Sequence, residues 1–246
     1  MKRLTAISLM LLSLSMLMAG GCGDGGGNNS SLFFVSNPFS SEVAEGSNTG
    51  LTVLGVNGII EINGSATIST ITISGVMKAG SADSAEAKVH IADMQVQVSV
   101  AGTVVMVETD HPSPAPTGIN YIVEYTITVP ETMSIDASQA NGEIYIQGME
   151  SDIKASQANG TIDVDAVMPS GGLIDLSTAN GEITLTIPTD ISADLMCQSA
   201  TGSVRVYNLT VLSPVSGPHS LSGTLDGGDG NIEITTANGD ITVQGI

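Results

Sequence analysis

The sequence predicts an all-β protein built as a parallel β-solenoid, in which coils of about 18–21 residues stack on one another. The main observation is a repeated phrase, Ala-Asn-Gly-x-Ile, with copies at 140–144, 158–162, 179–183 and 237–241. A repeat of nearly fixed period indicates stacked units that bury their apolar faces against each other. Only 3% of residues are aromatic and Trp is absent, which suits a thin core of small β-branched side chains.

Each Asn-Gly pair is expected to form a corner of a coil. Both residue types tolerate a positive φ, which costs other residues about 1–2 kcal/mol. Thr201-Gly202 is a degenerate copy of the pair. If the corners stack, successive asparagine side chains should form a ladder of amide hydrogen bonds along one edge. The expected corner residues are Asn141, Gly142, Asn159, Gly160, Asn180, Gly181, Gly202, Asn238 and Gly239.

Apolar and polar residues alternate on both sides of each corner. Pairs such as Ile144/Ile146 and Ile162/Val164 should point inward, because a slip of one residue would bury charge. The residues expected to face outward include Asp136, Tyr145, Lys154 and Asp163.

An antiparallel β-meander or sandwich is the alternative fold, because Asn-Gly between apolar runs is also typical of two-residue hairpins. The short strands and the recurrence of one tripeptide favour the solenoid.

The N-terminus indicates export. Residues 1–21 have a basic start and an apolar stretch at 7–18, and small residues lead up to Cys22. This pattern resembles a bacterial lipoprotein signal, which implies that Cys22 carries the lipid anchor; Gly23 after it suggests the outer membrane. The alternative is an ordinary secreted protein that is cleaved nearby. We expect no cofactor, and membrane contact only through the anchor.

Residues 22–47 are expected to hold the lipidated cysteine, a flexible tether and an N-terminal cap or edge strand that contains Phe33, Phe34 and Phe39. A single solenoid domain should fill residues 48–246. Within it, residues 87–100 alternate like a strand, and residues 209–223 should form a loop.

The chain is strongly acidic, with a formal charge of −19. Loss of residues 1–21 would remove Lys2 and Arg3 and no acid, which gives −21. Such a surface repels phosphate backbones, so nucleic-acid binding is excluded.

Few residues point to a metal or catalytic site. Asp226 and Asp229 lie in a Gly-rich turn that resembles one incomplete calcium-binding nonapeptide, and a Gly-rich corner is the simpler interpretation. His90, His111 and His219 are scattered and expected to be solvated. Cys197 lies in a predicted strand and should be a buried small side chain.

Three segments together resemble a bacterial adhesin-like domain family of unknown function, common in lipoproteins and envelope proteins. These segments are Val56-Asn57-Gly58-Ile59, residues 121–130 and the Asn-Gly-x-Ile coils, and the resemblance runs from about Asn48 to Ile246. It implies a parallel β-solenoid without established catalytic residues.

We therefore expect a lipid-anchored, non-catalytic binding or scaffold protein of the bacterial envelope, whose partner is an envelope or surface glycan or protein. Tyr145 and Tyr207 are the favoured contacts, because exposed aromatic residues are frequent at interfaces. The alternatives are a β-helix enzyme that acts on polysaccharide and a purely structural envelope protein. After residue 21 only Lys78, Lys88, Lys154 and Arg205 could hold an anionic sugar.

Overall fold

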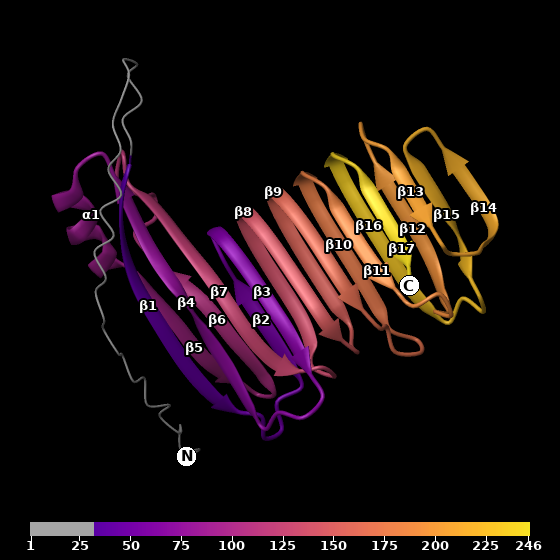
Figure 1. The fold of residues 1–246 in the computed structure, drawn as a ribbon, viewed down its shortest axis with the longest axis horizontal. Coiled ribbons are helices and arrows are strands. Elements are labelled where there is room, and N and C mark those ends of the chain that lie inside the picture. Colours follow the sequence, from indigo (N-terminus) through magenta and orange to yellow (C-terminus); the bar gives the residue numbers. More distant parts are fainter. Residues whose placement is uncertain (1–31) are drawn as a thin grey trace.

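The computed structural model describes residues 32–246, which form an all-β protein with one mixed sheet of seventeen strands (Figure 1). The predicted signal peptide, Cys22 and the tether at 23–31 lie outside the described residues. The strands are β1 (Phe33–Ala44), β2 (Gly50–Leu54), β3 (Asn57–Ser65), β4 (Thr70–Ser81), β5 (Gln95–Ala101), β6 (Val104–Asp110), β7 (Asn120–Pro130), β8 (Ser134–Met149), β9 (Ile153–Ala166), β10 (Leu173–Asn180), β11 (Ile183–Ile187), β12 (Ala193–Ser199), β13 (Val204–Tyr207), β14 (Val211–Gly217), β15 (Ser220–Leu225), β16 (Gly230–Asn238) and β17 (Ile241–Gly245).

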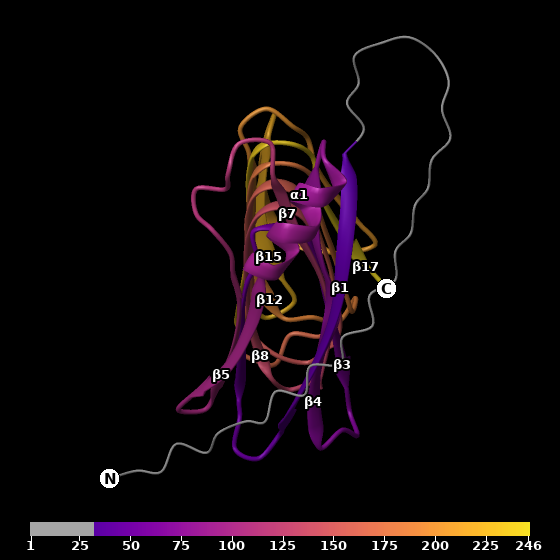
Figure 2. The ribbon, with the colours of Figure 1, turned by 90° about the vertical axis from the view of Figure 1, so that its left-hand side faces the viewer.

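The strands form two layers that face each other (Figure 2). The Asn-Gly corner of β8 separates two halves of that strand that pair with different neighbours. The half of β8 before Asn141 pairs in parallel with β2 and with the first half of β9. The half of β8 after Asn141 pairs with β3 and with the second half of β9. We call the strands paired before the corners the first layer and those paired after them the second layer.

The middle of the molecule is parallel, but both ends are antiparallel. Antiparallel pairs join β1 to β4, β4 to β7 and β5 to β6 at one end, and β12 to β15 and β14 to β15 at the other. The prediction of one purely parallel stack was therefore wrong. The Asn-Gly pairs of β8 and β9 lie within parallel-paired segments and not in hairpins.

The last two coils do not stack in chain order. Ile232 of β16 pairs with Ile174 of β10 on one side and with Leu195 of β12 on the other, so the C-terminal coil lies between two coils that precede it. The degenerate Thr201-Gly202 corner consequently occupies the end of the column. A terminal position needs a partner on one side only, so the loss of an asparagine is tolerated there.

Two local predictions were wrong in whole or in part. Of the strand expected at 87–100, only the part from Gln95 onward forms, as β5. Residues 84–90 form helix α1, followed by the 3-10 helix η1 (Ile91–Asp93). Asp83 accepts a hydrogen bond from the Ala85 backbone N–H at 2.7 Å and so caps the helix. Residues 209–223 do not form a loop but contain most of the β14–β15 hairpin, in which Pro214 lies on an edge strand that needs no further partner.

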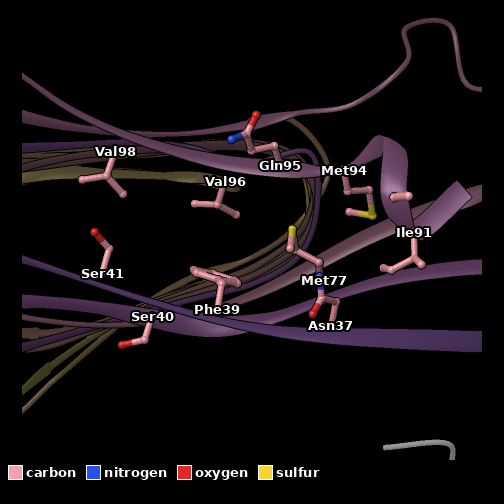
Figure 3. A pocket seen from close by; sticks show the side chains of 11 residues that line it. Asn37, Phe39, Ser40, Ser41, Met77, Ile91, Met94, Gln95, Val96 and Val98 are labelled. Atoms are coloured by element: carbon pink, nitrogen blue, oxygen red, sulfur yellow. The ribbon is translucent and has the colours of Figure 1, made fainter. Parts of the chain in front are cut away.

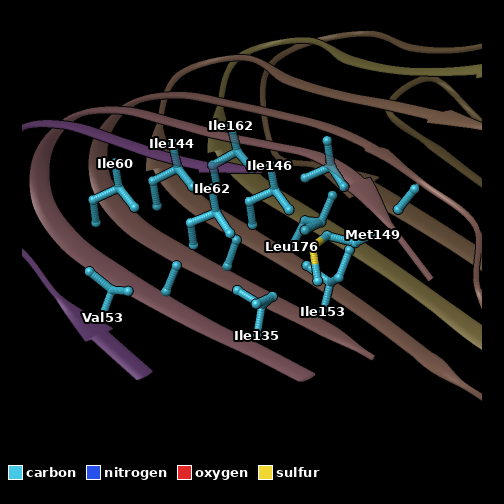
Figure 4. Packing of buried hydrophobic residues seen from close by; sticks show 14 of the residues in the cluster. Val53, Ile60, Ile62, Ile135, Ile144, Ile146, Met149, Ile153, Ile162 and Leu176 are labelled. Atoms are coloured by element: carbon cyan, nitrogen blue, oxygen red, sulfur yellow. The ribbon is translucent and has the colours of Figure 1, made fainter. Parts of the chain in front are cut away.

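The apolar side chains that were predicted to point inward fill the space between the layers. Ile60, Ile144 and Ile162 lie in one row across three neighbouring segments (Figure 4) and are at most 1% exposed. Val204 and Val206 are only half-buried, because β13 is the end strand of its layer and has no neighbour beyond it.

Asparagine side chains form a continuous ladder along the corners. Each donates its side-chain N–H to the side-chain oxygen of the preceding asparagine at 2.6–2.9 Å. The ladder starts at the Tyr121 carbonyl, which accepts from Asn57 at 3.0 Å, and ends at Thr201, whose hydroxyl donates to Asn238 at 3.1 Å. Its members in spatial order are Asn57, Asn141, Asn159, Asn180 and Asn238.

The glycines beside the ladder form a column in which consecutive backbones nearly touch. Gly142, Gly160, Gly181 and Gly239 all have positive φ, between 128° and 150°. A Cβ at any of these four, or at Gly202, would overlap the carbonyl oxygen of the neighbouring corner glycine. Gly202 is the one residue of these five whose φ is not positive. At this position, therefore, only the close packing against Gly239 requires glycine.

Replacement of Gly160 by Ala should lower the free energy of unfolding by roughly 3 kcal/mol or more, because the methyl group adds backbone strain and also overlaps Gly142. Gly171→Ala is the matched control, since Gly171 has φ 73° but no atom within 4 Å of its added Cβ. The control should lose only about 1–2 kcal/mol. Urea unfolding measures both, and equal losses would contradict the importance of the close approach.

Candidate functional site

The corner sets the side chains of the two layers on opposite faces of the molecule. Asp136 pairs with Lys154 in the first layer, whereas Tyr145 pairs with Asp163 in the second. The four residues expected to form one outward surface are therefore divided between two surfaces. In the first layer the row continues with Asp175 and Glu233, so Lys154 lies between acidic neighbours.

The second layer carries a cluster of outward carboxylates around Tyr145, which we call the acidic face. Rows on neighbouring segments are about 4.8 Å apart, so these carboxylates lie close together. Glu61, Tyr145 and Asp163 occupy equivalent positions on three neighbouring segments. The next segment is β11, where Ile183 pairs with Ile162 of β9. Glu182 directly precedes Ile183 and so lies next to the same group. The acidic face consists of Glu61, Glu143, Tyr145, Asp163, Asp165 and Glu182.

Repulsion and partial burial mark this cluster. Tyr145 donates its hydroxyl to Glu143 at 2.8 Å, and this hydrogen bond is the main reason why the pKa of Tyr145 is raised. Desolvation by neighbouring side chains raises the pKa of Asp163, and the charge of Asp165 adds to the effect. Negative charge on neighbouring carboxylates adds to both shifts. Among residues 32–246 no Lys or Arg lies inside the cluster.

Ion pairs lie at both ends of the acidic face. Lys78 contacts Glu124 on β7 at the N-terminal end. At the other end Arg205 of β13 contacts Asp240 at 2.7 Å. The backbone N–H of Ser203 donates to Asp240 at 2.8 Å; this bond, followed by the one from Arg205, lowers the pKa of Asp240 to about 2. The two cations are thus occupied outside the cluster.

Tyr207 lies on the same outer surface as Tyr145 but on β13, the last strand of the second layer. It is 49% exposed. Three segments (β9, β11 and β17) separate it from β8, a distance of roughly 19 Å at the usual strand spacing. The two tyrosines could therefore contact one extended partner but not one small ligand.

A buried polar row directly inside the corners was not expected from the sequence. Ser199 donates to the Gly239 carbonyl at 2.9 Å, and Thr236 donates to the Gly181 carbonyl at 3.2 Å. These bonds satisfy corner carbonyls that the turn leaves free. The sequence does contain a signal for this row, because a polar residue stands two places before each corner Asn or Thr. The row consists of Gln139, Gln157, Thr178, Thr236 and Ser199.

The two weak calcium candidates have different surroundings. Asp226 and Asp190 both line a hollow of about 290 Å³, whereas Asp229 accepts a hydrogen bond from Ser192 at 3.1 Å. Among residues 32–246, no three His, Cys, Asp or Glu side chains converge as metal ligands. Cys197 is 1% exposed, and burial raises the pKa of its thiol to about 12.

The three histidines were expected to be scattered, solvated side chains, but two of them contact the same residue. His90 lies 2.8 Å from Asp93 and 3.3 Å from the Tyr121 hydroxyl. The ring of His111 lies 5.2 Å from that of Tyr121. His90 and His111, twenty-one positions apart in the chain, therefore flank one buried tyrosine at the N-terminal end. His219 instead contacts the Gly202 carbonyl.

Asp240 gives the site a testable pH dependence. A carboxylate with a lowered pKa stabilises the fold above its unfolded-state pKa, and this contribution is lost as the pH falls toward about 2. Asp240→Asn should therefore lower the melting temperature at pH 7, and its difference from the unmodified protein should shrink as the pH falls from 4 toward 2. Glu233→Gln, which removes a charge in the first layer, is the control and should show no such convergence. A constant difference across that range would contradict the assignment.

In the part of the chain that the structure describes, no helix has the length and apolar character needed to span a membrane.

Comparison with known proteins identifies the fold. A crystal structure of a Clostridium sporogenes protein described as a candidate for cell adhesion has a TM-score of 0.55 and 12% identity, covering 86% of this chain and 100% of its own. At that identity the likeness shows a shared fold only. An adhesin candidate of Bacteroides fragilis covers 85% of this chain and 97% of its own at 10% identity, but its TM-score of 0.22 supports no argument.

No curated protein sequence matches the chain. The model of the Toastrack DUF4097 family matches residues 51–244, which extend from β2 to β17. Because this match spans most of the sequence and nearly all of the strands, the chain belongs to the Toastrack DUF4097 family.

Proposed function

We propose that the protein is a non-catalytic, adhesin-like binding protein of the bacterial envelope, held to the outer membrane by a lipid on Cys22. In this proposal the parallel coils form a short β-solenoid that serves as a rigid scaffold. The acidic face is the binding surface, with Tyr145 at its centre. The observation that carries the proposal is a fixed array of five carboxylates whose neighbouring cations are already paired at its two ends.

Charge complementarity defines the partner. A rigid row of carboxylates favours a protein segment or glycan that carries amino or guanidinium groups, and it repels acidic polysaccharides. The cell adhesion description of the Clostridium sporogenes protein agrees in kind with such a role. Binding of such a partner would use all five carboxylates together. No two of them need to act as a catalytic pair.

Neutralisation of the acidic face should weaken binding while the same change elsewhere does not. The triple variant Glu143→Gln, Asp163→Asn, Glu182→Gln should bind a deca-lysine peptide and amine-bearing glycans about tenfold or more weakly at low salt, since each exposed pair contributes about 0.2–1 kcal/mol. Asp136→Asn, Asp175→Asn, Glu233→Gln changes the net charge equally in the first layer and is the matched control. Biolayer interferometry at two salt concentrations measures both.

Two outcomes would contradict this proposal. Equal loss in the two triple variants would show that net charge, and not the acidic face, drives association. Turnover of a neutral or amine-bearing polysaccharide by the purified protein would support the alternative of a glycan-degrading enzyme.

Lipid anchoring is tested separately. Cells that express the unmodified chain should incorporate a labelled fatty acid into the protein, whereas the Cys22→Ala variant should incorporate none and should leave the membrane fraction. Cys197→Ala is the control, since Cys197 is buried and its replacement should leave labelling unchanged. Labelling that persists in Cys22→Ala would overturn the anchor.

A further inference from the structure

The N-terminal end of the molecule contains an apolar hollow between the two layers. There β1 pairs only with β4, and β5 pairs only with β6, so both strands leave one edge without a neighbour among the described strands. The hollow has a volume of about 330 Å³ and lies between these strands, with η1 as a third wall. The acidic face lies in the second layer on β3, β8, β9 and β11, and none of its residues lines the hollow.

Apolar side chains from three directions enter this hollow. Phe39 and Met77 come from the second layer, and Val96 and Met94 face them from the opposite side (Figure 3). Met77, Met94 and Val96 are 4–6% exposed, so the hollow reaches into the core and is not a surface dimple. The ring of Tyr125 packs edge-on against Phe39, with 5.6 Å between the ring centroids.

No charged side chain lines the hollow, although the chain as a whole carries a formal charge of −19. Asn37, Ser40, Ser41 and Gln95 lie along its walls, but the side chains of Ser40 and Gln95 point away from the space, whereas that of Ser41 points into it (Figure 3). Ser41 is 9% exposed, and none of the hydrogen bonds among the described residues uses its hydroxyl. An uncharged polar group of a ligand could therefore bond to Ser41, whereas an anion would enter without a counter-charge.

The wall formed by η1 is a single helical turn. His90, directly before this turn, is held by Asp93 and by the Tyr121 hydroxyl, and these contacts anchor the turn that carries Ile91. Methionine side chains adapt their shape to apolar ligands because they are unbranched and flexible. Met77 and Met94 therefore give the hollow a lining that can close around a flexible chain.

We propose that this hollow binds the alkyl chain of an uncharged single-chain amphiphile, whose hydroxyl, ester or amide end bonds to Ser41. The volume is at the lower limit for small-molecule sites, which suits one chain and not a two-chain phospholipid. The absence of lining charge selects a neutral ligand over a fatty-acid anion. This proposal does not depend on the function proposed for the acidic face.

Titration calorimetry of the full chain in detergent-free buffer tests the proposal with 1-octanoylglycerol, 1-decanoylglycerol and decanoate. Saturable binding at one site is expected, with the decanoyl glycerol tighter than the octanoyl by roughly tenfold, because two added methylenes leave water. Decanoate should bind at least tenfold more weakly than the decanoyl glycerol. Binding should also perturb the methyl NMR signals of Met77 and Met94.

Filling the hollow should abolish binding. Val98→Trp places an indole in the space, and Ile91→Trp is a second filling variant that enters from η1 and so leaves the sheets unchanged. Ser41→Ala should weaken binding about fivefold without blocking the chain. Val215→Trp, on an exposed position of β14 at the opposite end, is the control and should bind normally.

Several results would overturn the proposal. These are an absence of saturable binding, equal affinity for decanoate and the decanoyl glycerol, or unchanged binding in a filling variant whose melting temperature matches that of the unmodified protein. Equal loss in Val215→Trp would likewise exclude the hollow as the site.

Discussion

The close approach of successive corner glycines is the constraint on which the rest of the structure depends. Because each corner leaves no room for a Cβ beside the next, equivalent residues of every coil are held at the same height. That alignment brings the asparagines within hydrogen-bond distance of each other and puts the inward isoleucines into rows. It also places outward side chains in register, so a surface property at one coil is repeated at the next.

Parallel coils that stack in this way leave apolar edges at both ends, and this protein treats its ends differently. At the C-terminal end the β14–β15 hairpin extends the first layer, with Pro214 on the outermost strand. At the N-terminal end antiparallel strands extend both layers, and α1 with η1 covers only part of the gap between β1 and β5. The incompletely covered end is where the interior becomes accessible.

The two outer surfaces differ in charge although they come from the same repeats. Lys154 interrupts the acidic row of the first layer, whereas the cations of the second layer lie at its ends and are paired with Glu124 and Asp240. One surface is therefore partly neutralised, whereas the other carries a group of carboxylates whose nearest cations among the described residues lie at its ends. The uncharged hollow is a third distinct region. Because the three regions share no residues, each can be altered by substitution without changing the other two.

The sequence by itself determined the local pattern. Alternation placed Ile144 and Ile162 inside, and the repeated Asn-Gly pairs predicted where the chain turns, because both signals depend only on neighbouring residues. The tertiary structure decided what lies next to what. The insertion of β16 and β17 between earlier coils, the placement of Lys154 and Tyr145 in different layers, and the meeting of His90 with His111 at Tyr121 all depend on contacts between distant segments. Such contacts follow from packing energies summed over the whole molecule, and no short stretch of sequence records them.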